Sequence, residues 1–451
     1  MRKRRAREQN TCPTFSAGYH RAHLLSMSKQ SDPKHRETIA ILVGGGPAPG
    51  INGVIAAATI EAINEGKNVL GVYDGFRWLA QGDTDHVLTL TIDVVSRIHF
   101  QGGSILRTSR ENPTRDPKRM ANVLAALKKL DVDCLVTIGG DDTAFSSSQV
   151  EQQAAGAIRV VHVPKTIDND LPLPGSMPTF GYETARSVGA EIVHNLMEDA
   201  RTTSRWYFVI SMGRHSGHLA LGIGKAAGAT LTLIPEEFKK PRVTLVEVCD
   251  VIEAAILKRR ARGRLDGVAV IAEGLASKLT DADLKRLEKE NLAELDYDEF
   301  GNPKLSEVNF GRAVKEEIEA RFAHRKIKMA TVEKNIGYEV RCAPPVPFDC
   351  EYTRDLGYSA VRFLSSGGSG AMVSIQGGKM VPMYFPDIMD ERGKTRVRFV
   401  DTATESYEVA RKYMIRLGPE DFQDKAWVGK VAEAGGYSVS EFRKKFGYLG
   451  K

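Results

Sequence analysis

The chain has 451 residues, which is enough for two or three domains that each bury a core. With 42% hydrophobic and 27% charged residues, its composition is that of a globular protein and excludes a wholly disordered chain. No apolar run approaches the roughly 20 residues that cross a bilayer, and the five cysteines lack CxxC spacing. We therefore expect a cytoplasmic protein in a reducing compartment, with no membrane partner, disulfide framework or zinc site.

The net charge of +6 is concentrated in the first 36 residues. This segment carries nine Lys or Arg against Glu8 and Asp32, so the rest of the chain has a net charge of −1. Because the rest of the chain carries no excess positive charge, it has no general attraction for a polyanion, and we expect no nucleic-acid partner. Residues 1–36 show no clear hydrophobic period, and we predict a disordered basic tail. Met27 is a candidate start, and a transit peptide is the alternative.

From residue 37 onward, strand and helix patterns alternate. The apolar run Thr38–Val43 predicts a buried strand, GGGPAPG at 44–50 predicts a turn, and helical spacing predicts a helix over 51–65. A second amphipathic helix is expected after Pro117, before the next strand at Cys134–Ile138. Repeated strand–helix–strand units predict a doubly wound parallel sheet with right-handed crossovers.

Later segments are less regular. RWYFVISMGR at 205–214 and Gly267–Gly274 read as further buried strands with polar groups at their carboxyl ends. Residues 276–325 are rich in charge and predict an insertion or accessory element, with a turn at 298–304. The basic run KRRARGR at 258–264 is expected to be a solvated helix end that the helix dipole favours.

Two motifs follow consecutive predicted strands. GGDDT at 139–143 combines flexible glycines with two carboxylates, and PKTIDND at 164–170 adds a lysine and two more aspartates. Ligands of an open parallel sheet bind beyond the carboxyl ends of its strands, so these groups are expected at one site. Aspartates also form turns whatever the function, but the neighbouring motifs favour a metal and phosphate site.

Two glycine-rich runs are candidate phosphate cradles. GGGPAPG leads from a strand into a helix and exposes backbone N–H groups to an anion. Its spacing fits neither the GxGxxG dinucleotide fingerprint nor the GxxxxGK[ST] nucleotide loop. The run at 101–113 adds Arg107 and Arg110, whose guanidinium groups are suited to binding phosphate. A structural turn is the alternative for both runs.

From about residue 38 to 378 the chain resembles the 6-phosphofructokinases of the phosphofructokinase A family. The resemblance rests on seven runs in the family's order: GGGPAPGIN, GGSILRTSR, GGDDT, PKTIDND, SMGRHSGHLAL, AEG at 272–274 and GYEVRCAPPVPFD. It implies an α/β fold of two doubly wound parallel-sheet domains, with the active site in the cleft between them.

The resemblance also implies a division of the chain into domains. Residues 37–180 correspond to the donor-binding (diphosphate-binding) α/β domain, to which the chain crosses back near its C-terminus. Residues 181–400, including the insertion at 276–325, correspond to the sugar-phosphate-binding α/β domain. Residues 401–451 are expected to form a C-terminal helical segment.

Roles can be carried over to matching positions. Asp168 resembles the general base that accepts the proton of the C1 hydroxyl of fructose 6-phosphate, and Thr166 flanks it as a substrate contact. Asp141 resembles the residue that anchors Mg²⁺, the implied cofactor. Gly45 and Arg110 match contacts to the donor phosphate.

The sugar side of the site is matched in the later motifs. Asp170 is expected to support the metal site beside Asp168. Arg205 resembles an arginine that reaches the sugar phosphate of a neighbouring subunit, which implies a homo-oligomer, either dimer or tetramer, with shared sites. The remaining residues expected to bind the sugar phosphate are Met212, Gly213, Arg214, Glu273, Tyr338 and Arg341.

Two positions depart from the pattern of ATP-using members, GGDGS and PGTIDND. Here Asp142 replaces a glycine and Lys165 replaces another. The carboxylate of Asp142 adds bulk and negative charge where ATP would lie, and Lys165 places a cation near the departing phosphate. Both residues join Asp168 as predicted catalytic residues and as donor-phosphate contacts, and they resemble the pyrophosphate-dependent members.

The sequence therefore predicts a Mg²⁺-dependent pyrophosphate–fructose 6-phosphate 1-phosphotransferase that works reversibly in glycolysis and gluconeogenesis. An ATP-dependent 6-phosphofructokinase or a sedoheptulose-7-phosphate kinase is the alternative within the same class. A catalytically silent sugar-phosphate-binding regulatory subunit is the alternative from another class, and the presence of Asp141 and Asp168 argues against it. A NAD-binding oxidoreductase is disfavoured because the dinucleotide fingerprint is missing.

Overall fold

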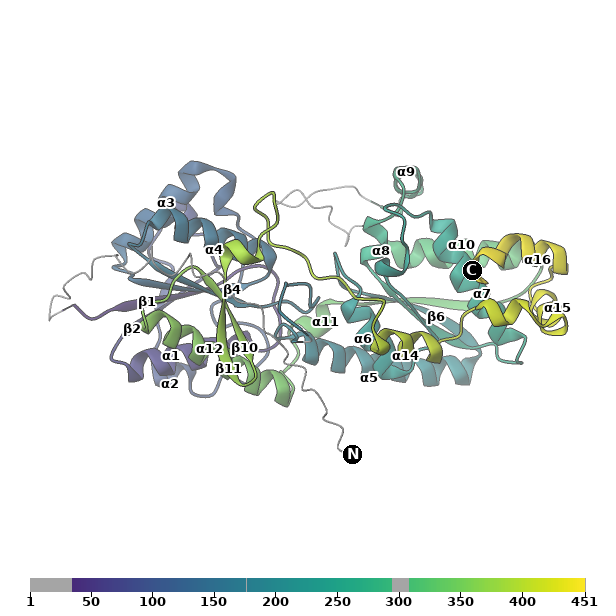
Figure 1. The fold of residues 1–451 in the computed structure, drawn as a ribbon, viewed down its shortest axis with the longest axis horizontal. Helices are drawn as coiled ribbons and strands as arrows, with labels where there is room; N and C mark the ends of the chain where they lie inside the picture. The colour runs from purple at the N-terminus through teal and green to yellow at the C-terminus, as the bar shows by residue number, and fades with distance from the viewer. Residues whose placement is uncertain (1–34, 176, 294–307, 451) are drawn as a thin grey trace, which may run out of the picture. The chain divides into compact units, whose positions relative to one another are not determined.

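Two β-sheets organise the chain in the structure, a computed structural model that describes residues 35–175, 177–293 and 308–450 (Figure 1). All but the last two residues of the predicted basic tail lie outside the described residues, as does the turn predicted at 298–304. Residues 37–451 group into one unit that contains both sheets.

The first sheet has seven strands, and its inner strands are parallel. The edge strands β3 and β11 are antiparallel to their neighbours. Such a sheet matches the predicted doubly wound architecture, with an antiparallel strand added at each edge. In spatial order the strands are β11 (Lys379–Tyr384), β10 (Ala371–Gln376), β5 (Arg159–Pro164), β4 (Cys134–Gly139), β1 (Thr38–Val43), β2 (Asn68–Val72) and β3 (Val87–Thr89).

Helices cover both faces of this sheet because successive side chains of a strand point to opposite sides. Ile39 and Ile41 of β1 pack under α1 (Ile51–Asn64) and α12 (Pro347–Ser365). Ala40 and Leu42 pack on the other face with α3 (Pro117–Lys129) and α4 (Asp141–Ala154). Figure 1 shows the two pairs of helices on opposite sides of the strands. Both helices predicted for this region, at 51–65 and after Pro117, are confirmed.

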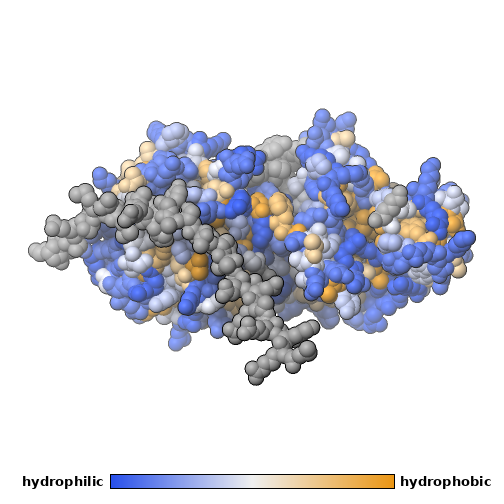
Figure 2. All heavy atoms as spheres, viewed as in Figure 1, coloured by the Kyte–Doolittle hydropathy of each residue, from blue (hydrophilic) through white to orange (hydrophobic). Residues whose placement is uncertain are grey.

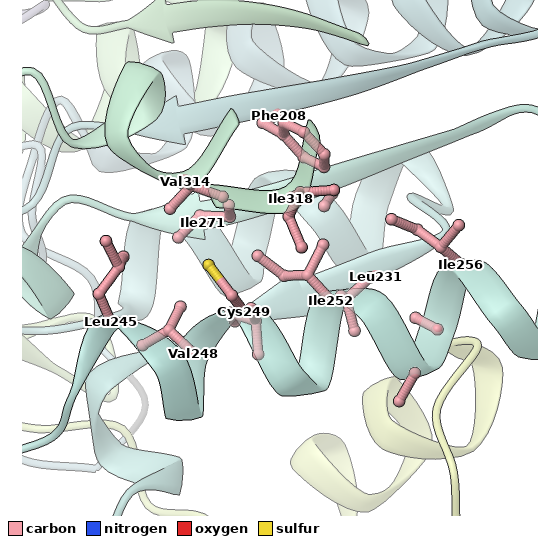
Figure 3. Packing of buried hydrophobic residues seen from close by; sticks show 14 of the residues in the cluster. Phe208, Leu231, Leu245, Val248, Cys249, Ile252, Ile256, Ile271, Val314 and Ile318 are labelled. Carbon is pink, nitrogen blue, oxygen red and sulfur yellow. The ribbon is translucent and has the colours of Figure 1, made fainter. Parts of the chain in front are cut away.

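The second sheet consists of four parallel strands: β7 (Leu231–Leu233), β8 (Gly267–Ala272), β6 (Arg205–Ser211) and β9 (Ala330–Ile336). One face packs on α5 (Tyr182–Thr203) and α6 (His218–Ala227). The other face packs on α7 (Leu245–Arg260) and α10 (Phe310–His324). Figure 3 shows this core between the second sheet and its helices, where Phe208 of β6 and Ile271 of β8 pack near Ile252 of α7 and Ile318 of α10.

The charge-rich stretch 276–325 contributes to that core. Its α10 buries an apolar face, in which Val314 and Ile318 are fully buried against the second sheet. The short helices nearby are α8 (Gly274–Ser277) and α9 (Asp281–Lys289). The other short helices are α2 (Ile92–Val95), α11 (Tyr338–Arg341) and α13 (Phe385–Ile388).

The last part of the chain connects the sheets and then covers α7. After α13, residues 389–404 lead to α14 (Glu405–Tyr413), and α15 (Lys425–Glu433) and α16 (Val439–Phe446) follow. Strands β10 and β11 lie within residues 181–400 yet pair with the first sheet, so the chain returns to that sheet before it ends in helices. The domain boundaries themselves stay a prediction.

The basic run at 258–264 ends α7 as predicted, and Arg262 and Arg264 are exposed, but the prediction that the whole run is solvated was wrong. The Lys258 ammonium is buried and lies 2.7 Å from an Asp421 carboxylate oxygen. The Arg259 and Arg264 guanidinium groups both bind Asp266. Lys258 thus links α7 to the C-terminal segment, and Arg259 and Arg264 hold the turn before β8. The sequence could not reveal the pair with Asp421, because this partner is remote along the chain.

The fold class predicted from the sequence, α/β with two doubly wound parallel sheets, is confirmed. None of the helices in the described part of the chain is long and apolar enough to cross a membrane. The face drawn in Figure 2 is largely hydrophilic where it is coloured, with hydrophobic areas scattered between the charged side chains.

Candidate active site

Loops at the carboxyl ends of strands from both sheets line one pocket. The first sheet contributes the turns after β1, β4 and β5, and the second sheet contributes the turns after β6, β8 and β9. This is where an open parallel sheet binds its ligands. The predicted site residues that line the pocket are Gly45, Arg110, Asp141, Asp142, Lys165, Thr166, Asp168, Met212, Arg214, Glu273, Tyr338 and Arg341.

The glycine turn after β1 brings two cations against its backbone. Gly45 has a left-handed φ of 81°, which favours glycine. The Lys165 ammonium donates a hydrogen bond to the Gly46 carbonyl. A Cβ on Gly46 would lie 3.2 Å from an Arg341 guanidinium nitrogen, so the missing side chain lets that arginine approach. The N–H groups of Gly44 and Gly45 already donate to the carbonyl groups of Ile138 and Ser109, so what the turn offers an anion is the positive charge of the two side chains beside it.

The GGDDT run ends β4 and begins α4. Asp141 and Asp142 occupy the first turn of α4, where the helix dipole stabilises carboxylates. Asp142 also lies 3.6 Å from the guanidinium of Arg214, across the pocket in the loop after β6. Beneath the run, the buried His162 bonds the Gly139 carbonyl through Nε2 at 3.0 Å, and burial lowers the pKa of this histidine to about 3. A neutral imidazole therefore supports the loop from below.

Lys165 is almost completely buried at the floor of the pocket, with 4% of its surface exposed. Burial lowers the pKa of its ammonium to about 7, the neighbouring Arg341 lowers it further, and the carboxylate of Asp168 opposes the change. A lysine that titrates near neutral pH in a phosphate-sized pocket is typical of a functional position.

Asp168 is held between the two sheets. Its carboxylate accepts a hydrogen bond from the backbone N–H of Arg214 at 3.4 Å, and its own N–H donates to the Thr166 hydroxyl at 3.0 Å. The Ser216 hydroxyl donates to the Asp168 carbonyl at 3.2 Å. These contacts orient one carboxylate toward the space that both sheets enclose.

Negative charge accumulates next to Asp168. Burial, together with the charges of Asp168 and Asp141, raises the pKa of Asp170 well above its ordinary value. Within residues 35–175, 177–293 and 308–450, no three His, Cys, Asp or Glu side chains converge closely enough to hold a metal by themselves. One or two carboxylates completed by substrate phosphates are the usual way to bind Mg²⁺, and these aspartates fit that pattern.

The sugar side of the pocket is built from the ends of β6, β8 and β9. The N–H of Gly213 donates to Glu273 at 3.4 Å, and burial followed by the charge of Asp168 raises the pKa of Glu273. A Cβ on Gly337 would lie 2.7 Å from the Met212 methyl carbon, so the two loops pack closely. The Arg341 guanidinium lies 5.3 Å from the centre of the Tyr338 ring, which is 69% exposed at the pocket mouth.

Two predicted residues do not line the pocket. Gly213 supports it through its bond to Glu273, with a φ of 145° that favours glycine. Arg205 begins β6, at the opposite end of the strand from the site, with its guanidinium 3.8 Å from Asp199. A role for Arg205 in its own pocket is therefore excluded by distance along the strand, whereas its predicted role in a neighbouring subunit stays a prediction.

The sequence reasoning missed part of the pocket wall. Glu111 and Thr143 lay inside runs already singled out, and residue type alone did not separate them from turn formers. The Glu111 carboxylate binds Arg119 of α3, so it is fixed in place. Phe76 and Ser146 carried no local signal, because they come from a turn and from the second turn of a helix.

Cations and carboxylates from both sheets gather in one pocket, an arrangement typical of a protein that transfers phosphoryl groups. This reaction needs positioning and charge neutralisation more than covalent chemistry. The model of the phosphofructokinase family matches residues 38–364. The chain belongs to the phosphofructokinase family, and the resemblance found in its motifs is confirmed.

Curated relatives agree with this membership. The chain is 53% identical to a pyrophosphate–fructose 6-phosphate 1-phosphotransferase of Naegleria fowleri, over 92% of this chain and 97% of the relative. It is 54% identical to a protein of the same name from Thermotoga maritima, over 91% of this chain and 98% of the relative. A solved structure of a pyrophosphate-dependent phosphofructokinase from Marinobacter aquaeolei shares the fold, with a TM-score of 0.64, 15% identity and coverage of 84% and 90%.

Proposed function

We propose that this chain transfers a phosphoryl group reversibly between pyrophosphate and the C1 hydroxyl of fructose 6-phosphate, in glycolysis and gluconeogenesis. The observation that carries the proposal is that Asp142 and Lys165, the two positions that depart from the ATP-using pattern, both line the pocket. The names of the two relatives that exceed 50% identity support the same donor and acceptor.

The donor is expected at the glycine turn. Lys165 lies against Gly46 and would neutralise the phosphate that leaves, while Arg110 and the turn at Gly45 would bind the rest of the diphosphate. Asp142 adds a carboxylate at the same end of the pocket, where it disfavours the larger nucleoside triphosphate by bulk and charge.

The acceptor is expected between Asp168 and the loops of the second sheet. Asp168 would accept the proton of the C1 hydroxyl at its carboxylate while the hydroxyl oxygen bonds to phosphorus. The bridging P–O bond of pyrophosphate then breaks, and orthophosphate leaves beside Lys165. Thr166 lies beside this step, and the sugar and its 6-phosphate would be bound by Met212, Gly213, Arg214, Glu273, Tyr338 and Arg341.

Mg²⁺ is the proposed cofactor, and Asp141, with Asp168 and Asp170 nearby, would hold it. Burial and the charges of Asp168 and Asp141 raise the pKa of Asp170, and a cation at this place would relieve the repulsion among these carboxylates. When bound, the ion supplies charge neutralisation for the phosphates. The residues of the chain supply the orientation, the base and the exclusion of water.

We further propose that the protein is a cytoplasmic homo-oligomer, either dimer or tetramer, with sites shared between subunits. The position of Arg205 at the far end of β6 supports this, because an arginine that cannot reach its own pocket is available to another. We further propose a donor domain at 37–180, to which the chain returns with α12, β10 and β11, a sugar domain at 181–400 and a helical segment at 401–451, with the pocket between the first two.

Donor comparison tests the proposal. Purified enzyme is assayed with fructose 6-phosphate and Mg²⁺, using pyrophosphate or ATP, and kcat/KM is compared in the wild type, Asp142→Gly, Lys165→Gly and the double variant. We expect a strong preference for pyrophosphate in the wild type. The ratio of ATP to pyrophosphate efficiency should rise in Asp142→Gly and in the double variant, because space and charge are relieved, and Lys165→Gly should impair pyrophosphate use.

The two positions are close enough to couple, so the effects need not add. Equal efficiencies of the wild type for both donors would contradict the proposed donor. A ratio that stays constant in Asp142→Gly and the double variant would show that this carboxylate is not the filter. No turnover with either donor would favour a silent sugar-phosphate-binding subunit.

A further inference from the structure

The segment that connects the two sheets near the C-terminus runs past the catalytic loops. This crossing segment, residues 389–400, leads from α13 to α14 and is the yellow-green trace that approaches α14 in Figure 1. It lies beyond the residues 38–364 that the family model matches and beyond all seven sequence motifs. None of its residues lines the pocket, so any effect on catalysis must act through the loops that it contacts.

Arg398 makes the densest set of these contacts. Its guanidinium donates to the Asn169 carbonyl at 3.1 and 3.2 Å and to the Asn169 side-chain oxygen. It also donates to the carbonyl groups of Leu173 at 3.2 Å and Met177 at 2.8 Å. The backbone N–H of Arg398 donates to the Asp170 carbonyl at 2.7 Å. All these acceptors follow Asp168 in the loop after β5.

The residue after the proposed base has an uncommon backbone conformation. Asn169 has a φ of +56°, in the left-handed region that residues with a side chain rarely adopt, although Asn adopts it more readily than most. Both oxygens of Asn169 bond to the same guanidinium, so the arginine stabilises the unusual backbone at the residue next to the proposed base. A change of backbone conformation at Asn169 would rotate the neighbouring Asp168 out of its place between the sheets.

The crossing segment also contacts the other catalytic loops. The Thr395 hydroxyl donates to the Asp141 carbonyl at 3.0 Å, at the start of α4. The N–H of Val400 donates to the Glu236 carboxylate at 3.0 Å, and the same oxygen accepts the N–H of Gly217 at 2.9 Å, just after the sugar-binding loop. The segment thus bonds loops at the ends of β4 and β5 directly and the loop after β6 through one shared carboxylate.

The chemistry of arginine suits this role. Burial lowers the pKa of Arg398 and the charge of Asp170 opposes that change, and a guanidinium stays charged at all relevant pH values. Its planar fork of five N–H donors can satisfy several carbonyl oxygens at once, whereas lysine has one compact ammonium group. A lysine at position 398 could therefore not make all of these hydrogen bonds.

We propose that Arg398 is a positioning residue, which holds the loop after β5 in the conformation that directs Asp168 toward the acceptor hydroxyl. The inference rests on the proposed role of Asp168 and adds to it a determinant from outside the family motifs. Displacing a reacting group by about 1 Å can cost about 10²-fold in rate, so loss of this support should be seen mainly in kcat.

The test compares Arg398→Ala and Arg398→Lys with Arg396→Ala. Arg396 is a matched control because it lies in the same segment and its guanidinium binds the Asp387 carbonyl, away from the catalytic loops. With pyrophosphate and fructose 6-phosphate, Arg398→Ala should lose about 10- to 100-fold in kcat, with both KM values within about threefold. Arg398→Lys should be intermediate, and added methylguanidinium should restore part of the turnover of Arg398→Ala alone.

Hydrogen exchange provides a readout that does not depend on the reaction. Amides of residues 167–177 should exchange faster in both Arg398 variants, while peptides from β1 and β6 keep wild-type rates and Arg396→Ala remains like the wild type. Should Arg398→Ala fail to fold, Arg398→Lys carries the same two measurements. Unchanged kcat, unchanged exchange in the loop, or an equal loss in Arg396→Ala would each overturn the proposal. If Asp168 proved dispensable, the base assignment would fail, whereas the exchange data would still decide whether Arg398 holds the loop.

Discussion

Asp168 and Lys165 lie three residues apart in one loop but have different surroundings. Asp168 is oriented by the backbone N–H of Arg214 from the opposite sheet, and Lys165 is buried against the glycine turn of its own sheet. The loop thus presents a carboxylate next to the second sheet and an ammonium next to the glycine turn. Both side chains reach the pocket because the loop directly follows the carboxyl end of β5.

Replacement of Asp168 by Ala or Asn is the direct test of its role at this scale. Removing a positioned base should lower kcat by about 10² to 10⁴, with a much smaller effect on binding of fructose 6-phosphate. Steady-state kinetics and a separate binding measurement of the sugar phosphate distinguish the two effects. Turnover within a few-fold of the wild type would assign the proton transfer to another group.

Lys165 predicts a pH dependence whose sign follows from its pKa. Because the pKa of about 7 lies below the ordinary value of 10.5, the side chain is charged below pH 7 and neutral above it in the free enzyme. We expect kcat/KM for pyrophosphate, which reports the free enzyme, to fall as the pH rises through about 7. Lys165→Arg is the control, since its guanidinium stays charged; a fall at the same pH in that variant would attribute the titration to another group.

At the scale of elements, the C-terminal helices are fixed to the second domain by a buried ionic network. Glu253 of α7 is fully buried and binds Arg321 of α10 at 3.0 Å, and Lys445 of α16 at 2.8 Å. The Tyr437 hydroxyl donates to the same carboxylate at 2.6 Å, and Arg325 binds it as well. Burial alone would raise the pKa of Glu253, but these partners hold it below its ordinary value.

Glu253→Gln should therefore destabilise the protein strongly. It keeps the shape of the side chain but removes the negative charge that Arg321, Arg325 and Lys445 share, although Arg321 keeps Asp250 and Glu317 as partners. Breaking a buried ion pair typically costs about 3–5 kcal/mol. Urea unfolding followed by fluorescence measures the loss in free energy of unfolding. Glu408→Gln is the control, because its pair with Lys412 is solvent-exposed and should contribute nothing measurable. Equal stability of the two variants would show that the network does not anchor the helices.

At the scale of the whole molecule, shared sites can be tested by mixing two inactive proteins. If Arg205 serves the neighbouring subunit, a hybrid of Arg205→Ala and Asp168→Ala subunits has one site with both side chains intact. When equal amounts of the two variants exchange subunits freely, about half the dimers are hybrids, and each hybrid has one of its two sites intact. The mixture should then regain about one quarter of the wild-type activity. Mixed oligomers without regained activity would place Arg205 outside the shared site.

Much of the site could be predicted from the sequence because its chemistry lies in turns that directly follow buried strands. An apolar strand, a glycine and a run of charged residues are all local features, and parallel strands bring their carboxyl ends to one edge. This is why Gly45, Asp141, Lys165 and Asp168 were found and line one pocket. The roles assigned to them stay predictions until the variants are measured.

Other features depended on contacts between distant segments. The burial of Lys258 could not be predicted, because its partner Asp421 is remote in the sequence and a basic run by itself is typical of a solvated surface. Likewise, the sequence analysis did not single out β10 and β11, and only their pairing assigns them to the first sheet.

Periodicity and turn chemistry within short stretches were enough to predict the alternation of strands and helices, the family motifs and the residue types of the pocket. The loops that share a pocket wall, the depth at which Lys165 is buried and the bonds from Arg398 to the loop of Asp168, more than two hundred residues away, became known only from the packed chain. Burial and long-range hydrogen bonds depend on which residues are neighbours in space, and the whole fold sets those neighbours.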